Sequence, residues 1–209
     1  SDIFTVQDEI TKNIITALQV KLTTGEEIRV AAKGTKNLEA YLKYLKAYEY
    51  TNKINPDSNE MGKQLAEEAI ALDPGYASAY FCLAGAYALD VWLGTSKSPK
   101  QSIGTAMNLL QKAIELDDSF GEAYGFLGFL YTMTGQHDKA ILHGEKAVSL
   151  NPNSAECHYR LGKVLSFAGM WKESIPEYER AIRLNPIPPN KYMFSIGLAY
   201  GWIGQYDEA

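Results

Sequence analysis

The sequence predicts an all-α fold, a right-handed superhelix of stacked antiparallel helix pairs with an extra helix at the N-terminus. One helix ending recurs at 69–74, 147–152 and 181–186, each time as an apolar stretch that closes on Asp-Pro or Asn-Pro. The prolines Pro152 and Pro186 are 34 residues apart, and glycine turns recur at Gly135, Gly169 and Gly204. A fixed period of this length indicates a helical solenoid. The 46% hydrophobic content is enough for a substantial core.

The N-terminal segment, 1–24, is expected to form an amphipathic helix that stands apart from the repeats. Its apolar residues recur at helical spacing and would lie along one stripe: Ile3, Phe4, Val6, Ile10, Ile14, Leu18 and Leu22. A polar connector, 25–37, then leads into the repeats. The chain starts without an initiating Met, which favours an excised piece of a longer protein.

Five helix-pair units follow the connector. The first, 38–76, is divergent, and the second, 77–120, is longer than the period by ten residues. The third and fourth, 121–154 and 155–189, keep the period, and 190–209 supplies only a first helix.

Particular residues are expected to shape each unit. A glycine at the eighth position, such as Gly128, lets two antiparallel helices approach closely. The turn glycine supplies a positive φ, and the final proline cannot continue the helix. In the first unit, Asp57 and Glu60 are expected to form a capping box after Asn55-Pro56.

The ten additional residues of 77–120 predict two extended helices that project a knob from one edge of the stack. They include an apolar turn at 91–94. Ser98 is expected to cap the second helix, with Pro99 at its first position and Gln101 completing a capping box.

These features resemble the tetratricopeptide repeat family. In 121–154 the signature positions are held by Tyr124, Leu127, Gly128, Tyr131, Ala140, Ala147 and Pro152. In 155–188 they are held by His158, Leu161, Gly162, Leu165, Ser174, Tyr178, Ala181 and Pro186. The resemblance implies a concave groove, lined by first helices, that binds a protein or peptide.

A narrower resemblance covers the whole chain. The segment 2–10 (DIFTVQDEI) is followed by 35–45 (TKNLEAYLKYL) and then by repeats with the ending ALDPGYA. This order is similar to bacterial signalling proteins, namely class III adenylate or guanylate cyclases and winged-helix regulators, in which a TolB-like domain precedes tetratricopeptide repeats. The resemblance implies a regulatory region without catalytic residues of its own, in a parent protein that is a nucleotide cyclase or a regulator.

The candidate binding site is the set of groove positions that the family resemblance implies, namely the second, fifth, ninth, twelfth and thirteenth of each first helix. Aromatic and Met side chains at these positions suit a peptide-binding groove. The alternative is that some of them form ordinary core between repeats. The candidate groove residues are Phe81, Phe129, Met133, Tyr159, Lys163, Phe167, Phe194 and Trp202, together with Leu89 and Leu198. The Lys and Asn that clamp chaperone tails in some family members are replaced here, so a chaperone-tail adaptor is not expected.

Catalytic, metal and cofactor sites are not predicted. His137 follows a turn glycine and is expected to be a packing aromatic, His143 a surface residue and His158 a core or semi-buried residue. Cys82 and Cys157 lie in different repeats and are expected to be free, buried thiols.

The charge balance and hydropathy limit the classes of partner. A formal net charge of −5 disfavours nucleic acid, and no apolar run reaches the length of a membrane span. The expected partner is a protein, a peptide or another domain of the same polypeptide. Self-association as a homodimer and a contribution to the substrate channel of a larger enzyme are the alternatives. Two unpaired thiols favour the cytoplasm, unless an upstream membrane span places the repeats outside.

Overall fold

The computed structural model describes residues 34–185 and 187–205, and within them every regular element is a helix. The first helices of successive pairs are α3 (Leu38–Thr51), α5 (Ala77–Trp92), α7 (Gly121–Met133), α9 (Ala155–Phe167) and α11 (Asn190–Trp202). The second helices are α4 (Pro56–Leu72), α6 (Pro99–Leu116), α8 (His137–Leu150) and α10 (Trp171–Leu184). The predicted N-terminal helix, 1–24, and most of the connector lie outside the described residues.

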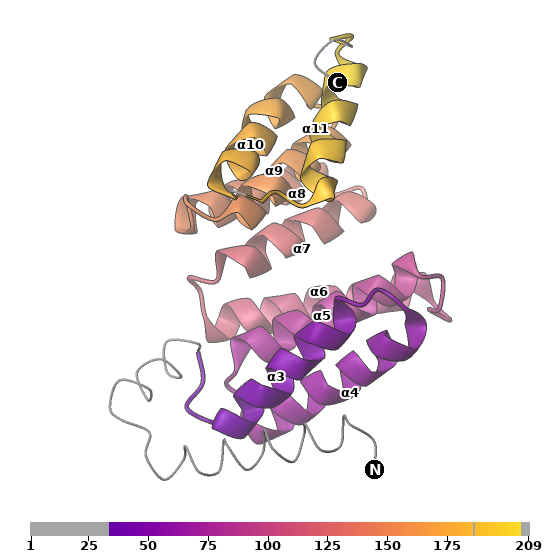
Figure 1. Ribbon diagram of the computed structural model, residues 1–209, viewed down its shortest axis with the longest axis vertical. Coiled ribbons are helices and arrows are strands. Elements are labelled where there is room, and N and C mark those ends of the chain that lie inside the picture. Colours follow the sequence, from indigo (N-terminus) through magenta and orange to yellow (C-terminus); the bar gives the residue numbers. More distant parts are fainter. Residues whose placement is uncertain (1–33, 186, 206–209) are drawn as a thin grey trace.

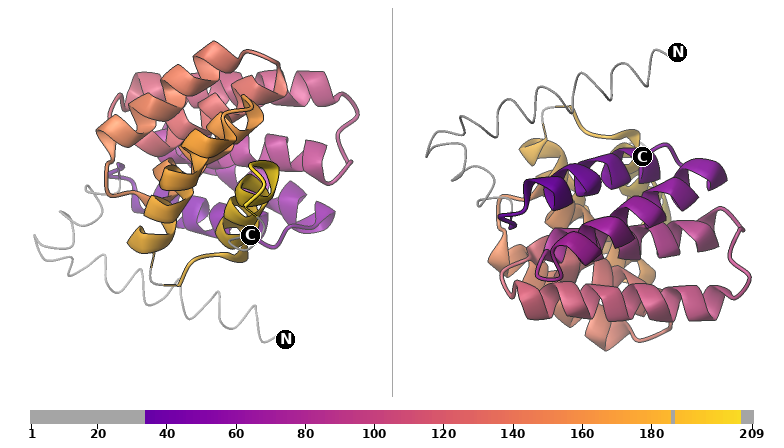
Figure 2. Two further views of the ribbon diagram at one scale, coloured as in Figure 1. Left: turned by 90° about the horizontal axis from the view of Figure 1, so that it is seen from above. Right: turned by 90° about the horizontal axis from the view of Figure 1, so that it is seen from below.

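The helices stack along one long axis. Each second helix packs against the first helix of its own pair and against the first helix of the next pair. Figure 1 shows this order from α3 and α4 at one end to α10 and α11 at the other. The end-on views in Figure 2 show successive pairs turning relative to one another. The predicted all-helical superhelix is confirmed.

Glycine sets the closeness of the pairs and the geometry of the turns. A Cβ added to Gly128 would lie 2.9 Å from the backbone oxygen of Ala140, so α7 and α8 approach as closely as the sequence predicted. The turn glycines Gly135, Gly169 and Gly204 all have positive φ, at 73°, 80° and 79°. Side chains with a Cβ rarely adopt this conformation, which explains why glycine recurs at these turns.

The second pair is longer than its neighbours, as its ten additional residues predicted. α5 has 16 residues and α6 has 18, whereas α7 and α8 have 13 and 14. Figure 1 shows the tip of this pair projecting beyond the rest of the stack. Trp92, at the tip, is 75% exposed.

Both predicted capping boxes are wrong. Asn55 caps α4, because its side chain accepts a hydrogen bond from the Ser58 amide, and Asp57 lies inside the helix. Ser98 does occupy the N-cap of α6, but its side chain makes no capping hydrogen bond. The loop is held instead by a 2.8 Å hydrogen bond between the Ser96 and Ser102 hydroxyls.

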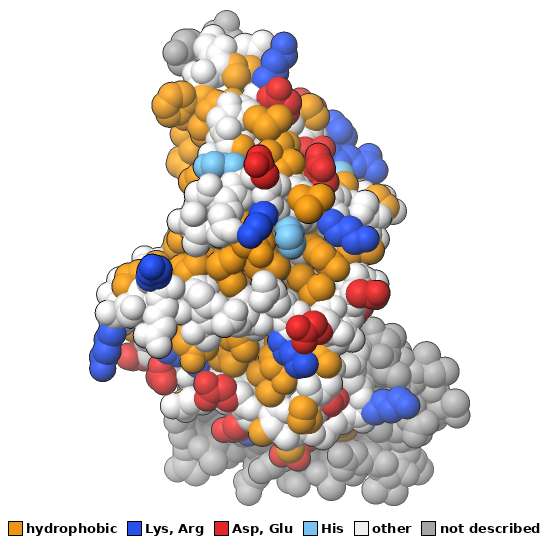
Figure 3. Space-filling view, turned by 180° about the vertical axis from the view of Figure 1, so that it is seen from behind, with side chains coloured by type: hydrophobic (Ala, Val, Ile, Leu, Met, Phe, Trp, Pro, Cys, Tyr) orange, Lys and Arg blue, Asp and Glu red, His pale blue; other side chains and the backbone are white. Residues whose placement is uncertain are grey.

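The main core lies between α5, α6 and α7 and reaches Val164 of α9. The backbones of α5 and α7 approach each other less closely than those of α7 and α9. Large aromatic side chains fill the wider space, with the ring of Phe81 5.1 Å from Phe120 and 5.8 Å from Phe126. The molecule seen from behind carries hydrophobic side chains in a band across its middle, with scattered charges of both signs around it (Figure 3). The described part of that face therefore has no continuous basic surface.

Candidate functional site

The candidate site is built on three first helices, α7, α9 and α11. α9 packs between the other two, so residues at equivalent positions of the three helices form adjoining rows. Six large apolar side chains lie on this face and are called here the groove residues: Phe129, Met133, Phe167, Phe194, Leu198 and Trp202. Phe129 is half-buried and the other five are exposed, with Phe194 and Trp202 each 68% exposed.

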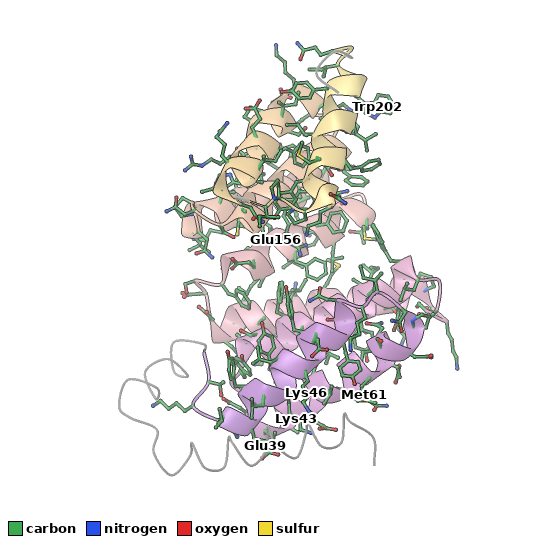
Figure 4. All side chains as sticks on the ribbon, viewed as in Figure 1. Glu39, Lys43, Lys46, Met61, Glu156 and Trp202 are labelled. Carbon is green, nitrogen blue, oxygen red and sulfur yellow. The ribbon has the colours of Figure 1, made fainter. Side chains whose placement is uncertain are left out.

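Aromatic contacts connect these residues across repeat boundaries. The rings of Phe129 and Phe167 meet edge to face with their centroids 6.0 Å apart. The indole of Trp202 stacks on that of Trp171, with centroids 5.3 Å apart and an interplanar angle of 12°. Trp202 projects from the end of α11 opposite to Glu156, which lies beside the start of that helix (Figure 4). The aromatic face therefore extends from α7 to the last described turn of α11.

A pocket of about 310 Å³ opens between α9, α10 and α11. Its walls come from Lys163, Ser166, Phe167, Gly169, Trp171, Tyr178, Ser195 and Leu198. The hydroxyls of Ser166 and Tyr178 hydrogen-bond each other at 3.0 Å, so these two polar groups in the wall are already paired. The pocket thus offers mainly apolar surface, with the ammonium of Lys163 as its cation.

A carboxylate organises the charges at the base of α11. One oxygen of Glu156 accepts from Arg160 at 3.0 Å, and the other accepts from Lys191 at 3.0 Å and from the Tyr192 hydroxyl at 3.2 Å. Burial raises the pKa of Glu156, but Arg160 and Lys191 outweigh it and hold that pKa below its usual value. Glu156 is therefore an ionised link between α9 and α11.

Lys163 differs from these paired cations. Its Nζ lies 4.9 Å from the centroid of the Phe167 ring and 5.6 Å from that of Phe129. No carboxylate within residues 34–185 and 187–205 forms an ion pair with it. Burial, with a smaller contribution from the charge on Lys191, lowers the pKa of Lys163. Among the described residues its ammonium is thus held by the two aromatic rings, which attract a cation through their quadrupoles.

Other sequence-predicted groove residues lie in packing. Phe81 is half-buried and contacts Phe120 and Phe126 between repeats. Tyr159 is half-buried and stacks on Tyr192 with centroids 4.5 Å apart. Leu89 is half-buried on α5. Phe81 and Tyr159 thus pack against the core between repeats.

The histidines divide between expected and unexpected positions. His158 is buried, as expected, with its ring nitrogens 2.7 Å from a Glu177 carboxylate oxygen and 3.0 Å from the Pro152 carbonyl oxygen. The expectation for His137 is wrong, because its side chain is exposed at the start of α8. His143 is half-buried, with Nδ1 2.8 Å from the Lys139 carbonyl oxygen and its ring beside Tyr131.

Sequence reasoning missed the pocket walls contributed by α10. Trp171, which follows the turn glycine Gly169, lines the pocket and stacks on the groove residue Trp202. The available signal is its place in the chain. It follows Phe167, at the thirteenth position of α9, by only four residues, so the turn brings both rings to one end of the pair.

Metal and membrane features are absent from the part of the chain that the structure describes. No three His, Cys, Asp or Glu side chains within it are grouped so that they could hold a metal ion. None of the described helices combines the length and apolarity needed to cross a bilayer. Cys82 and Cys157 are free, buried thiols, as expected.

The comparisons with known proteins agree with this architecture. The family model described as "Tetratricopeptide repeat" matches residues 121–154 and 155–188. The matched residues form two tetratricopeptide repeats, α7 with α8 and α9 with α10, within the longer stack of helix pairs. The family's fold is that of a protein-interaction module.

A bacterial relative is similar to much of the chain. A segment of 139 residues, 66% of the chain, is 32% identical to "Putative adenylate cyclase 3" of Rhizobium meliloti (strain 1021). The chain spans about a quarter of that relative, 24% of its length.

Solved structures show the same fold. A crystal structure of MamA is 25% identical, with a TM-score of 0.52, and the match covers 81% of this chain and 85% of MamA. A second MamA crystal structure is 28% identical with the same TM-score, covering 73% of this chain and 82% of the other. A thermophilic tetratricopeptide repeat protein of Thermus thermophilus is 18% identical with a TM-score of 0.63, covering 78% of this chain and 81% of the other.

Proposed function

We propose that this chain is a non-catalytic, regulatory interaction module of a larger bacterial signalling protein related to adenylate cyclases. It binds a peptide or a domain, from a partner or from its own polypeptide, on the face formed by α7, α9 and α11. The observation that carries the proposal is the contiguous set of groove residues. Five of the six are exposed although they are large and apolar.

The physical argument concerns the cost of leaving such a surface in water. Contiguous exposed apolar patches are unusual on monomeric proteins and commonly mark interaction sites. Burial of apolar area contributes about 25 cal/mol per Å², so covering several aromatic side chains supplies a large favourable term for association. Aromatic residues, and tryptophan above all, are also the usual binding hot spots.

The relative named for adenylate cyclase supports the signalling context. The chain spans only about a quarter of that protein, so the cyclase activity that its name states would belong to other regions of a parent of the same kind. The groove would then couple partner binding to that activity. The repeats themselves would contribute recognition.

The test is site-specific photo-crosslinking followed by a binding measurement. A photoreactive phenylalanine analogue replaces Phe194, and in a control it replaces Leu142, which is 63% exposed on α8. The proposal expects one protein or domain to be captured from position 194 and not from position 142. The purified partner should then bind the unmodified chain and lose binding to Phe167→Ser/Leu198→Ser. Equal capture from both positions would contradict the proposal.

Self-association is a second candidate, because α11 exposes Met193 as well as Phe194, Leu198 and Trp202. Sedimentation across a hundredfold range of concentration distinguishes the two. Self-association predicts a dimer that Phe167→Ser/Leu198→Ser disrupts. The interaction-module proposal predicts a monomer at every concentration.

A further inference from the structure

Lys163 is a half-buried cation without an anionic partner in the described part of the chain. The neighbouring Arg160 and Lys191 both bind Glu156. Lys163 instead contacts the rings of Phe129 and Phe167 and forms part of the pocket wall. Lys163 therefore adds an ammonium whose charge interacts with that of Lys191, on a chain whose formal net charge is −5.

This local surplus of positive charge is poorly solvated. Burial and the nearby charge of Lys191 both disfavour the ammonium of Lys163 and lower its pKa. A cation in partly buried surroundings is stabilised most by an anion brought into contact with it, because the attraction is screened less there than in water. The groove thus offers charge complementarity to a carboxylate.

The pocket supplies the second half of the recognition. It lies directly beside Lys163, and its other walls are largely apolar and aromatic, including Phe167, Trp171 and Leu198. Its volume of about 310 Å³ lies at the lower end of the range for ligand pockets, which suits one bulky side chain. A carboxylate at Lys163 and an apolar group in the pocket would therefore belong to adjacent residues of one ligand.

We infer that the groove recognises a short protein segment in which an acidic side chain, paired with Lys163, adjoins a bulky apolar side chain that enters the pocket. The inference rests on the proposed function and specifies its ligand. A purely apolar segment would leave Lys163 without a counter-ion. A basic segment would meet the ammonium of Lys163 and the nearby charge of Lys191.

A displayed library of random internal peptides, selected on the immobilised chain, tests the ligand chemistry. The starting chain is expected to enrich Asp or Glu next to Phe, Leu or Trp. A parallel selection on Lys163→Glu should lose the acidic preference. Lys172→Glu reverses an exposed charge on α10 and should leave the preference intact.

A selected peptide, resynthesised with both ends blocked, is then titrated against the variants. The peptide is expected to bind Lys163→Met about tenfold more weakly, because this variant loses one partly buried ion pair. A peptide whose acidic residue is replaced by Lys should bind Lys163→Glu more tightly than it binds the starting chain, because the two charges are then exchanged. Circular dichroism melting curves of each variant establish that it is folded.

The outcomes separate this inference from the proposed function. Peptides that depend on Phe167 and Leu198 but show no acidic preference would overturn the inference and leave the interaction module standing. An acidic preference that survives in the selection on Lys163→Glu would also overturn it. Recovery of no peptide that depends on the groove residues would contradict both.

Discussion

The ring of Phe167 meets the ring of Phe129 edge to face across the boundary between two repeats, with centroids 6.0 Å apart. Lys163, one helical turn before Phe167, places its ammonium over both rings. Aromatic pairs of this geometry contribute about 0.5–1.5 kcal/mol beyond their buried area. The pair therefore joins two repeats while leaving Phe167 54% exposed to a ligand.

The close approach of α7 and α8 is tested by adding one methyl group to Gly128. Its Cβ would lie 2.9 Å from a backbone oxygen that cannot move aside cheaply. We expect Gly128→Ala to lower the free energy of unfolding by about 1–3 kcal/mol in urea titrations. Gly104→Ala, on α6, is the control, because nothing lies within 4 Å of its Cβ, and it should be neutral or stabilising. Equal effects would show that the helices are not in close contact at Gly128.

The link made by Glu156 should appear in the acid dependence of stability. Its pKa is lower in the folded chain than the ordinary value of 4.5, so the unfolded chain binds protons more readily. The stabilisation is therefore present above about pH 4.5 and is lost as the pH falls through the lowered pKa. Glu156→Gln should cost about 1–2 kcal/mol at neutral pH and flatten this part of the unfolding profile. If the loss of stability at acid pH were the same in Glu156→Gln as in the unmodified chain, Glu156 would not form this link.

The amine of Lys163 should titrate at a lower pH than an ordinary lysine. Because its folded pKa is lowered, the unfolded chain binds more protons, and this group makes the free protein more stable as the pH rises through that window. Side-chain carbon NMR of Lys163 measures the pKa directly. Lys191→Met removes the second cause, so the pKa should move upward by part of its shift. No movement would mean that burial acts alone.

The two thiols should be protected in the folded chain. Burial raises the pKa of Cys82 to about 12 and that of Cys157 to about 11, and the thiolate is the reactive form. A disulfide reagent at pH 8 is expected to label neither thiol in native protein and both in urea. Rapid native labelling would show that one of these repeats opens readily.

Positions set by local backbone requirements could be predicted from the sequence. Gly135, Gly169 and Gly204 adopt positive φ, and Gly128 sits where two helices meet, because each of these requirements excludes most other residues. The longer α5 and α6 also follow directly from the added residues.

Exposure could not be predicted with the same success. Phe81 and Phe129 are both half-buried and pack against the main core, and Phe81 fills the wide space between α5 and α7. Phe167 belongs to a similar row and is exposed, since α9 and α11 leave a pocket beside it. These differences depend on the distance between neighbouring repeats, which is set by many side chains together.

The capping residues could not be predicted for a related reason. Asn55, Asp57 and Ser58 are all plausible caps, and the backbone at Asn55-Pro56 decides that Asn55 is used.

His137 shares its position with Trp171, but only Trp171 has a partner, Trp202, in the described next helix.

The central claim is that recognition occurs on the face formed by α7, α9 and α11. Titration calorimetry tests it most directly. The purified partner that crosslinking identified is titrated against three forms of the chain: unmodified, Phe167→Ser/Leu198→Ser, and Leu142→Ser as the control. We predict that the groove variant binds at least about tenfold more weakly, equivalent to about 1.4 kcal/mol, while the control binds as the unmodified chain does. Unchanged binding by the groove variant, or an equal loss in the control, would contradict the account.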